Sequence, residues 1–145
     1  MRRPLAAGLL ILAVAAAGCD SEEPEPEGGR IGAGSEYVAI GDSYTAAGLT
    51  GPTEQQTGCL QSEANYPHLV AEELDLDLTD VSCGGATTAN VTKKQKTTTS
   101  TRPPQLDALS TSTDLVTVSL GGNDDQAFYQ VTAGCVRLAT LDPTG

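Results

Sequence analysis

The sequence predicts an α/β fold with three layers (α/β/α), in which helices cover both faces of a mostly parallel sheet. Residues 37–40 and 115–120 are short apolar segments that run directly into glycine, which is typical of buried strands. Residues 76–81 alternate apolar side chains with Asp or Thr and indicate a half-exposed strand. Residues 66–74 have helical spacing and lie between the first two strands. Strands that alternate with helices favour parallel pairing.

The first helix is predicted over residues 66–74. Pro67 suits a first helical turn, where its missing N–H group has no intrahelical partner to lose. Val70 and Leu74 are four residues apart and share one face, with Leu69 beside them.

Two further helices are expected nearer the C-terminus. A short one is predicted around Leu106 and Leu109, which lie three residues apart after a pair of prolines. The other covers residues 126–140, after the third strand. With 145 residues and no internal repeat, the chain fits one domain.

The N-terminus has the pattern of an export signal. Arg2 and Arg3 precede an apolar run, residues 5–17, that is too short to cross a bilayer comfortably. Small residues then lead to Cys19, which resembles a bacterial lipobox, in which the cysteine is lipidated after cleavage. We therefore expect a signal peptide at residues 1–18 and an exported protein anchored to the cell membrane through Cys19. Ordinary signal cleavage beside an unrelated cysteine is the alternative.

Residues 19–35 are expected to be a lipid anchor and an acidic tether. After Cys19 this stretch is mostly Asp, Glu, Pro, Gly and Ser, and it holds too little apolar surface to fold by itself. Prolines and like charges keep such a segment extended. The folded domain is predicted over residues 36–145.

The charge and the cysteine pattern exclude several functions. A formal net charge of −11 argues against nucleic-acid binding, which needs a basic surface. The basic cluster Lys93, Lys94 and Lys96 is interpreted as a solvated loop, with capture of an anionic ligand as the alternative. The 4 cysteines contain no Cys-x-x-Cys pair, so a zinc site is not expected. No other metal or cofactor is implied.

Ser43 is the candidate nucleophile. A serine hydrolase needs an exposed hydroxyl at a sharp turn, donors aimed at the developing oxyanion, and a base. Ser43 directly follows the first predicted strand, and ligands gather at the carboxyl ends of strands in open α/β sheets. Thr45 departs from the Gly-x-Ser-x-Gly pattern. The alternative is a simple capped turn, in which Asp42 or Ser43 satisfies a helix N-terminus.

Glycine turns with polar groups also follow the other two strands. Residues 83–85 (Cys-Gly-Gly) follow the second strand, and residues 121–124 (Gly-Gly-Asn-Asp) follow the third. Together with Gly-Asp-Ser at 41–43, these blocks, in this order, resemble the SGNH (GDSL-like) hydrolase family, in its secreted bacterial lipase and esterase branch. The resemblance covers about residues 37–135. It implies the flavodoxin-like α/β/α fold of that family.

The resemblance also implies a catalytic arrangement. Ser43 would attack an ester carbonyl, and the oxyanion would be held by the backbone N–H groups of Ser43 and Gly85 and by the side-chain amide of Asn123. Gly85 has a structural alternative as a residue without Cβ at a tight turn, and Asn123 as an ordinary turn former. Related secreted enzymes bridge the pair that matches Cys59 and Cys83, so a disulfide is expected there.

The catalytic base is missing from the pattern. The family's histidine belongs to a later Asp-x-x-His block, which does not occur in this sequence. The single histidine, His68, lies at the start of the first predicted helix and is interpreted as a partly exposed helix residue. Cys135 would lack a partner in this chain. These observations predict that residues 36–145 form the N-terminal part of an SGNH hydrolase domain and that the chain is truncated.

The predicted function is serine-dependent hydrolysis of carboxylic esters through an acyl-enzyme, acting on an ester or lipid substrate. Without its base, this chain is expected to be weakly active or inactive. The alternative is a non-catalytic surface lipoprotein that uses the same fold as a binding module. A downstream Asp-x-x-His block would discriminate between the two.

Overall fold

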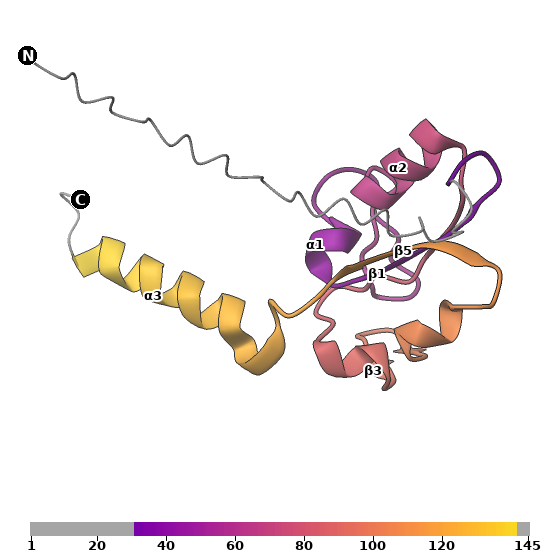
Figure 1. Ribbon diagram of the computed structural model, residues 1–145. Coiled ribbons are helices and arrows are strands. Elements are labelled where there is room, and N and C mark those ends of the chain that lie inside the picture. Colours follow the sequence, from indigo (N-terminus) through magenta and orange to yellow (C-terminus); the bar gives the residue numbers. More distant parts are fainter. Residues whose placement is uncertain (1–30, 142–145) are drawn as a thin grey trace, which may run out of the picture.

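The computed structural model describes residues 31–141. Its main sheet contains β1 (Glu36–Gly41), β2 (Asp77–Asp80) and β5 (Thr113–Ser119), in the order β2-β1-β5, and both pairings are parallel (Figure 1). The predicted α/β fold with a mostly parallel sheet is therefore confirmed. The expected signal peptide and the expected lipidation at Cys19 lie outside the described residues.

Strand β1 is the buried centre of the molecule. It has a parallel neighbour on each side, and all its residues except Glu36 are buried. Tyr37 and Ala39 form a core cluster with Ala71 and Leu76. Residues 37–41 carry no charged side chain, as expected for a central parallel strand that is covered on both faces.

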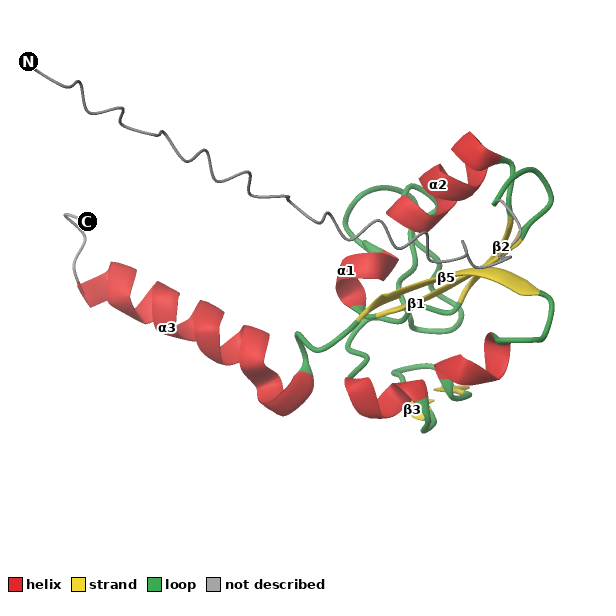
Figure 2. Cartoon of the chain, in the orientation of Figure 1, coloured by secondary structure: helices red, strands yellow, loops and turns green. Residues whose placement is uncertain are grey.

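The two faces of the sheet carry different elements. Helices α1 (Ser43–Ala46) and α2 (Tyr66–Leu74) lie on one side, and the segment between β2 and β5 lies on the other (Figure 2). That segment contains the 3₁₀ helices η1 (Thr88–Val91) and η2 (Gln105–Ala108). The layered arrangement agrees with the prediction.

Helix α2 has the predicted bounds. Its buried residues are Pro67 and Ala71, and Val70 packs at the edge of the core, whereas Leu74 is 47% exposed and Leu69 is also exposed. The predicted helix is therefore confirmed, and of its apolar residues Val70 and Leu74 only Val70 packs against the core. Ala71 is the helix residue that joins the core cluster with Tyr37 and Ala39.

The segment that covers the second face includes a small ribbon that the sequence did not predict. Strands β3 (Gln95–Lys96) and β4 (Thr101–Arg102) pair antiparallel. In the neighbouring η2, the buried residue is Gln105, while Leu106 is exposed. The short helix predicted after the two prolines is thus present, and the residue that it buries is a glutamine. Lys93, Lys94 and Lys96 are all exposed, in agreement with a solvated stretch.

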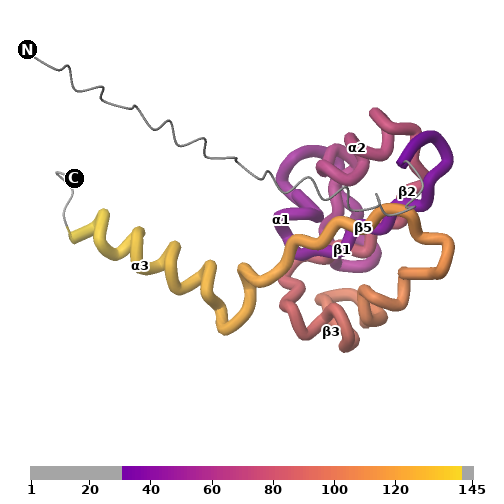
Figure 3. The backbone as a smooth tube through the Cα atoms, in the orientation of Figure 1, coloured from indigo at the N-terminus to yellow at the C-terminus, as the bar shows by residue number. Residues whose placement is uncertain are grey.

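Helix α3 (Ala127–Leu141) follows the short 3₁₀ helix η3 (Asp124–Gln126). The predicted C-terminal helix is confirmed, but it leads away from the strands (Figure 3). All of its side chains are exposed. Cys135 lies on this helix as an exposed free thiol. Within residues 31–141, no helix combines the length and apolar character that crossing a bilayer requires.

Candidate active site

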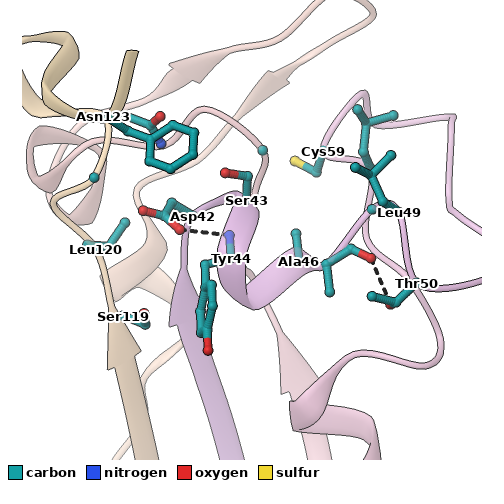
Figure 4. A pocket seen from close by; sticks show the side chains of 16 residues that line it. Asp42, Ser43, Tyr44, Ala46, Leu49, Thr50, Cys59, Ser119, Leu120 and Asn123 are labelled. Carbon is teal, nitrogen blue, oxygen red and sulfur yellow. Dashed lines mark hydrogen bonds between the residues drawn. The ribbon is translucent and has the colours of Figure 1, made fainter. Parts of the chain in front are cut away.

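A cavity of about 690 Å³ lies at the carboxyl end of the sheet. It is open to solvent, and Ser43 and Asn123 both line it (Figure 4). Most of its remaining wall is apolar. It comes from the end of α1, the loop between α1 and α2, the residue after β5 and the start of α3, namely Ala46, Ala47, Leu49, Leu60, Leu120 and Phe128. Two of the polar residues that follow strands in the sequence, Ser43 after β1 and Asn123 after β5, thus line the same cavity.

The Ser43 turn is fixed by its neighbours on both sides. A Cβ atom at Gly41 would overlap the side chain of Thr45, so only glycine fits where β1 meets α1. The Asp42 carboxylate accepts a hydrogen bond of 2.9 Å from the Tyr44 N–H and caps α1. The expected capping function of Asp42 is present, and it coexists with an exposed Ser43 that faces the cavity.

The second turn is held against the first. The Cys83 N–H donates to the Gly41 carbonyl at 3.0 Å, which continues the β1–β2 pairing into the two turns. The disulfide between Cys59 and Cys83, as the resemblance implied, ties the loop before α2 to the same place. Gly85 has φ +75°, a conformation that side chains with a Cβ rarely adopt. Gly84, which the sequence analysis did not single out, lines the cavity, whereas Gly85 does not.

The third turn is joined to the second by side chains. One N–H of the Asn123 amide donates to the Ala86 carbonyl at 2.8 Å. The Asp124 carboxylate accepts hydrogen bonds from the backbone N–H and the hydroxyl of Thr88, at 2.8 and 2.7 Å. Asn123 therefore lies at the cavity, and its amide nitrogen makes one hydrogen bond among the described residues.

Two buried glutamines support these turns from the other face of the sheet, and the sequence analysis assigned neither of them a function. Gln105 pairs with the backbone of Gly41, with its oxygen accepting from the Gly41 N–H and its nitrogen donating to the Gly41 carbonyl, both at 2.9 Å. Gln95 donates to the Gly84 carbonyl at 2.9 Å. Gln105 follows two prolines and Gln95 lies between two lysines, and neither sequence context indicates a buried side chain.

The structure places no histidine at the cavity. His68 is half-buried in the first turn of α2, where its Nδ1 lies 2.7 Å from the Asn65 side-chain oxygen. It does not line the cavity. Residues 31–141 also contain no group of three or more His, Cys, Asp or Glu side chains arranged to hold a metal ion. The described part of the cavity therefore presents the Ser43 hydroxyl and the Asn123 amide.

Comparison with known proteins agrees with this arrangement. Residues 39–141 match the profile of the GDSL-like Lipase/Acylhydrolase family. The chain is 45% identical to Lipase 2 of Streptomyces coelicolor over 107 residues, which are 73% of this chain and 35% of that protein.

Two solved structures are also similar to this chain. Phospholipase A1 from Streptomyces albidoflavus NA297 has a TM-score of 0.58 and 33% sequence identity, over 72% of this chain and 40% of that one. The extracellular lipase from Streptomyces rimosus has a TM-score of 0.52 and 32% identity, over 62% of this chain and 35% of that one.

The match extends over most of this chain but over a smaller part of its relatives. The chain spans between 28% and 48% of the length of the curated relatives it matches. Their shared region includes the three turns described above, since the family profile begins in β1 and continues into α3. The chain belongs to the GDSL-like lipase/acylhydrolase family, as its three sequence blocks suggested.

Proposed function

We propose that the whole protein hydrolyses carboxylic esters with Ser43 as its nucleophile. The observation that carries this proposal is the exposed serine at a strand-to-helix turn, facing a largely apolar cavity of about 690 Å³ that Asn123 also lines. A nucleophile beside an amide donor and an apolar wall suits an ester whose acyl or alkyl part is apolar.

The reaction proceeds through an acyl-enzyme. The Ser43 Oγ bonds to the carbonyl carbon, the bond from that carbon to the alcohol oxygen breaks, and the alcohol leaves with a proton. Water then adds to the acyl carbon and releases the acid and the free serine. In each tetrahedral intermediate, the negative oxygen accepts hydrogen bonds from the N–H groups of Ser43 and Gly85 and from the free N–H of the Asn123 amide.

The proton of the serine hydroxyl needs a base. His68 is held at Asn65 and does not line the cavity, so in this chain the acceptor is a base from the solution, such as hydroxide or a buffer amine. General-base catalysis by a positioned side chain contributes about 10²–10⁴-fold in rate. The chain by itself is therefore weakly active or inactive.

The substrate is an ester with an aliphatic or lipid acyl group. Leu49, Leu60, Leu120 and Phe128 line the cavity and supply apolar surface but no charge. The similar proteins carry the names lipase, esterase and phospholipase A1, which fits substrates of this class.

The proposal is tested by hydrolysis of p-nitrophenyl butyrate in a buffer that contains imidazole as an added base. Ser43→Ala should abolish the protein-dependent rate, and Asn123→Ala should lower it by about 10²-fold, because one oxyanion donor is lost. Ser112→Ala is the matched control, since Ser112 is an exposed serine immediately before β5, at the other end of the sheet. Equal protein-dependent rates in the parent and in Ser43→Ala would overturn the nucleophile assignment.

A second function is favoured by the absence of a histidine at the described cavity. In that case the chain is a non-catalytic surface lipoprotein that binds apolar ligands in the same cavity. This alternative predicts no Ser43-dependent turnover, but saturable binding of a fluorescent fatty acid that Leu120→Asp abolishes. Binding that is unchanged in Leu120→Asp would exclude this cavity as the site.

Export and lipid anchoring belong to the same proposal. The Cys59–Cys83 disulfide suits an oxidising compartment, and one similar structure is described as extracellular. Cys19 would carry the lipid that holds the protein at the membrane. The full chain should partition into the detergent phase when expressed in a bacterial host, and Cys19→Ala should move it to the aqueous phase. The same partition in both would exclude the anchor.

A further inference from the structure

Gln95 is a buried polar residue directly behind the second turn of the site. Its side chain is only 9% exposed, although it lies on the short ribbon strand β3. The Gln95 Nε2 donates a hydrogen bond of 2.9 Å to the carbonyl oxygen of Gly84. The two lysines before it and the one after it are exposed, so the amide is specifically turned inward.

The Gly84 carbonyl and the Gly85 N–H belong to one peptide unit. That unit is planar, and no cis peptide bond occurs among the described residues, so the two groups point in opposite directions. Fixing the direction of the Gly84 oxygen therefore fixes the direction of the Gly85 N–H. A donor bonded to the oxygen also polarises the peptide and strengthens its N–H as a donor.

The rest of this turn leaves the same N–H free. The preceding peptide is held separately, because the Gly84 N–H donates to the Cys59 carbonyl at 2.8 Å. The Ala86 N–H closes the turn by donating to the Cys83 carbonyl at 3.0 Å. Gly85 itself is exposed, and its N–H has no acceptor among residues 31–141. Glycine at φ +75° also has more rotational freedom than other residues, so without an external contact the peptide would reorient easily.

We propose that Gln95 is a positioning residue of the oxyanion site, which holds the Gly84–Gly85 peptide so that the Gly85 N–H faces the oxygen of a ligand bonded to Ser43. This inference rests on the proposed function, because Gly85 matters only where Ser43 forms a tetrahedral adduct. Gln95 touches neither the ligand nor the reacting atoms. It acts through the Gly84 carbonyl.

The probe is n-butylboronic acid with the full chain. The Ser43 Oγ forms a bond to the trigonal boron, and the hydroxyl proton passes to the buffer, which gives a tetrahedral boronate with a negative charge. Such an adduct imitates the intermediate of ester hydrolysis without requiring turnover. Two readouts are recorded, namely the dissociation constant and the shift of the Gly85 amide resonance in ¹⁵N-labelled protein.

Gln95→Leu should weaken boronate binding by about tenfold or more, because the N–H that it positions is one of the oxyanion donors. The shift of the Gly85 resonance on binding should also be lost. Gln61→Leu is the matched control, because the Gln61 Nε2 donates to the Asp80 carbonyl at the same distance of 2.9 Å, and Gln61 does not line the cavity. It should bind within about twofold of the parent, as expected for a site without a functional contact.

Gln95→Glu gives a readout that a purely structural role would not change. A protonated carboxyl can donate to the Gly84 oxygen, whereas a carboxylate can only accept and repels it. At low pH, Gln95→Glu should therefore bind the boronate about as tightly as the parent does. As the pH rises through the pKa of the new carboxyl, the ratio of its affinity to that of the parent should fall. This variant keeps the side-chain shape and also serves if Gln95→Leu fails to fold.

The outcomes separate this inference from the proposed function. Equal boronate affinity in the parent and in Ser43→Ala overturns the proposed function and, with it, the inference. Ser43-dependent binding that Gln95→Leu leaves at the level of Gln61→Leu overturns the inference alone. A ratio of Gln95→Glu to parent affinity that does not change with pH overturns it as well.

Discussion

Strand β1 and helix α3 represent two different ways in which this chain forms regular structure. Residues 37–41 are buried and contact elements on both faces of the sheet, whereas α3 is exposed along its whole length. A helix satisfies its backbone hydrogen bonds internally, but a strand has to find partners elsewhere in the chain. Stability should therefore depend on the residues around β1. Substitutions in α3 beyond Phe128, which lines the cavity, should change neither stability nor site geometry.

The largest effect that would test this contrast concerns the disulfide. Replacing Cys59 and Cys83 together by alanine should lower the free energy of unfolding by about 3–4 kcal/mol, because the bridge joins two residues that are 24 positions apart in the unfolded chain. Urea unfolding followed by tyrosine fluorescence measures the change. Cys135→Ala is the control, because its thiol is free and exposed on α3, and it should leave the unfolding midpoint unchanged.

A larger loss in Cys135→Ala than in the double variant would reverse the comparison. It would mean that α3 contributes packing that its exposed side chains do not suggest. If the free energy of unfolding fell by less than about 1 kcal/mol in the variant that lacks both Cys59 and Cys83, the unfolded chain would already be compact around this loop.

A smaller effect compares two valines. Val38 in β1 is 3% exposed and Val131 in α3 is 65% exposed. Val38→Ala should lower the free energy of unfolding by about 2 kcal/mol. The variant loses the favourable free energy of burying two methyl groups away from water, and it leaves a cavity in the core. Val131→Ala should change stability by less than about 0.5 kcal/mol. Equal losses in the two variants, measured by urea unfolding, would contradict the assignment of the core to β1.

Most of the fold could be predicted because its signals are local. The strands around residues 37–41 and 113–119 and the start of α2 at Tyr66 follow from apolar runs, glycines and a proline at the first turn. The buried face of α2 could not be predicted, because Ala71 packs in the core whereas the more hydrophobic Leu74 is exposed, and hydrophobicity alone would favour the reverse. The β3–β4 ribbon is too short to leave a periodic pattern.

The site was predictable in part for a different reason. Ser43 and Asn123 each follow a strand, and the carboxyl ends of parallel strands meet at one edge, so their presence at one cavity follows from topology. The supporting glutamines were not predictable, because Gln95 and Gln105 act through hydrogen bonds to backbone groups more than ten residues away in sequence. Such contacts depend on the packed layers and have no sequence spacing of their own.

The smallest effect concerns the alkaline limit of stability. Burial raises the pKa of the Tyr37 hydroxyl above its ordinary value, and its hydrogen bond of 2.8 Å with Thr117 opposes this shift only in part. The folded state therefore keeps the proton more tightly than the unfolded state. The free energy of unfolding should therefore not depend on the titration of Tyr37 below about pH 10, and it should fall as the pH rises above that value.

Tyr37→Phe removes the group that titrates. It should lower stability at neutral pH by about 1 kcal/mol, through loss of the hydrogen bond to Thr117. Above about pH 10 its stability should fall less steeply than that of the parent, in urea unfolding series over that range. Tyr129→Phe, on the exposed surface of α3, removes no buried contact and should follow the parent at every pH. If Tyr37→Phe fell as steeply as the parent, the alkaline loss would have to come from tyrosines outside the core, and the contrast between β1 and α3 would not extend to titration.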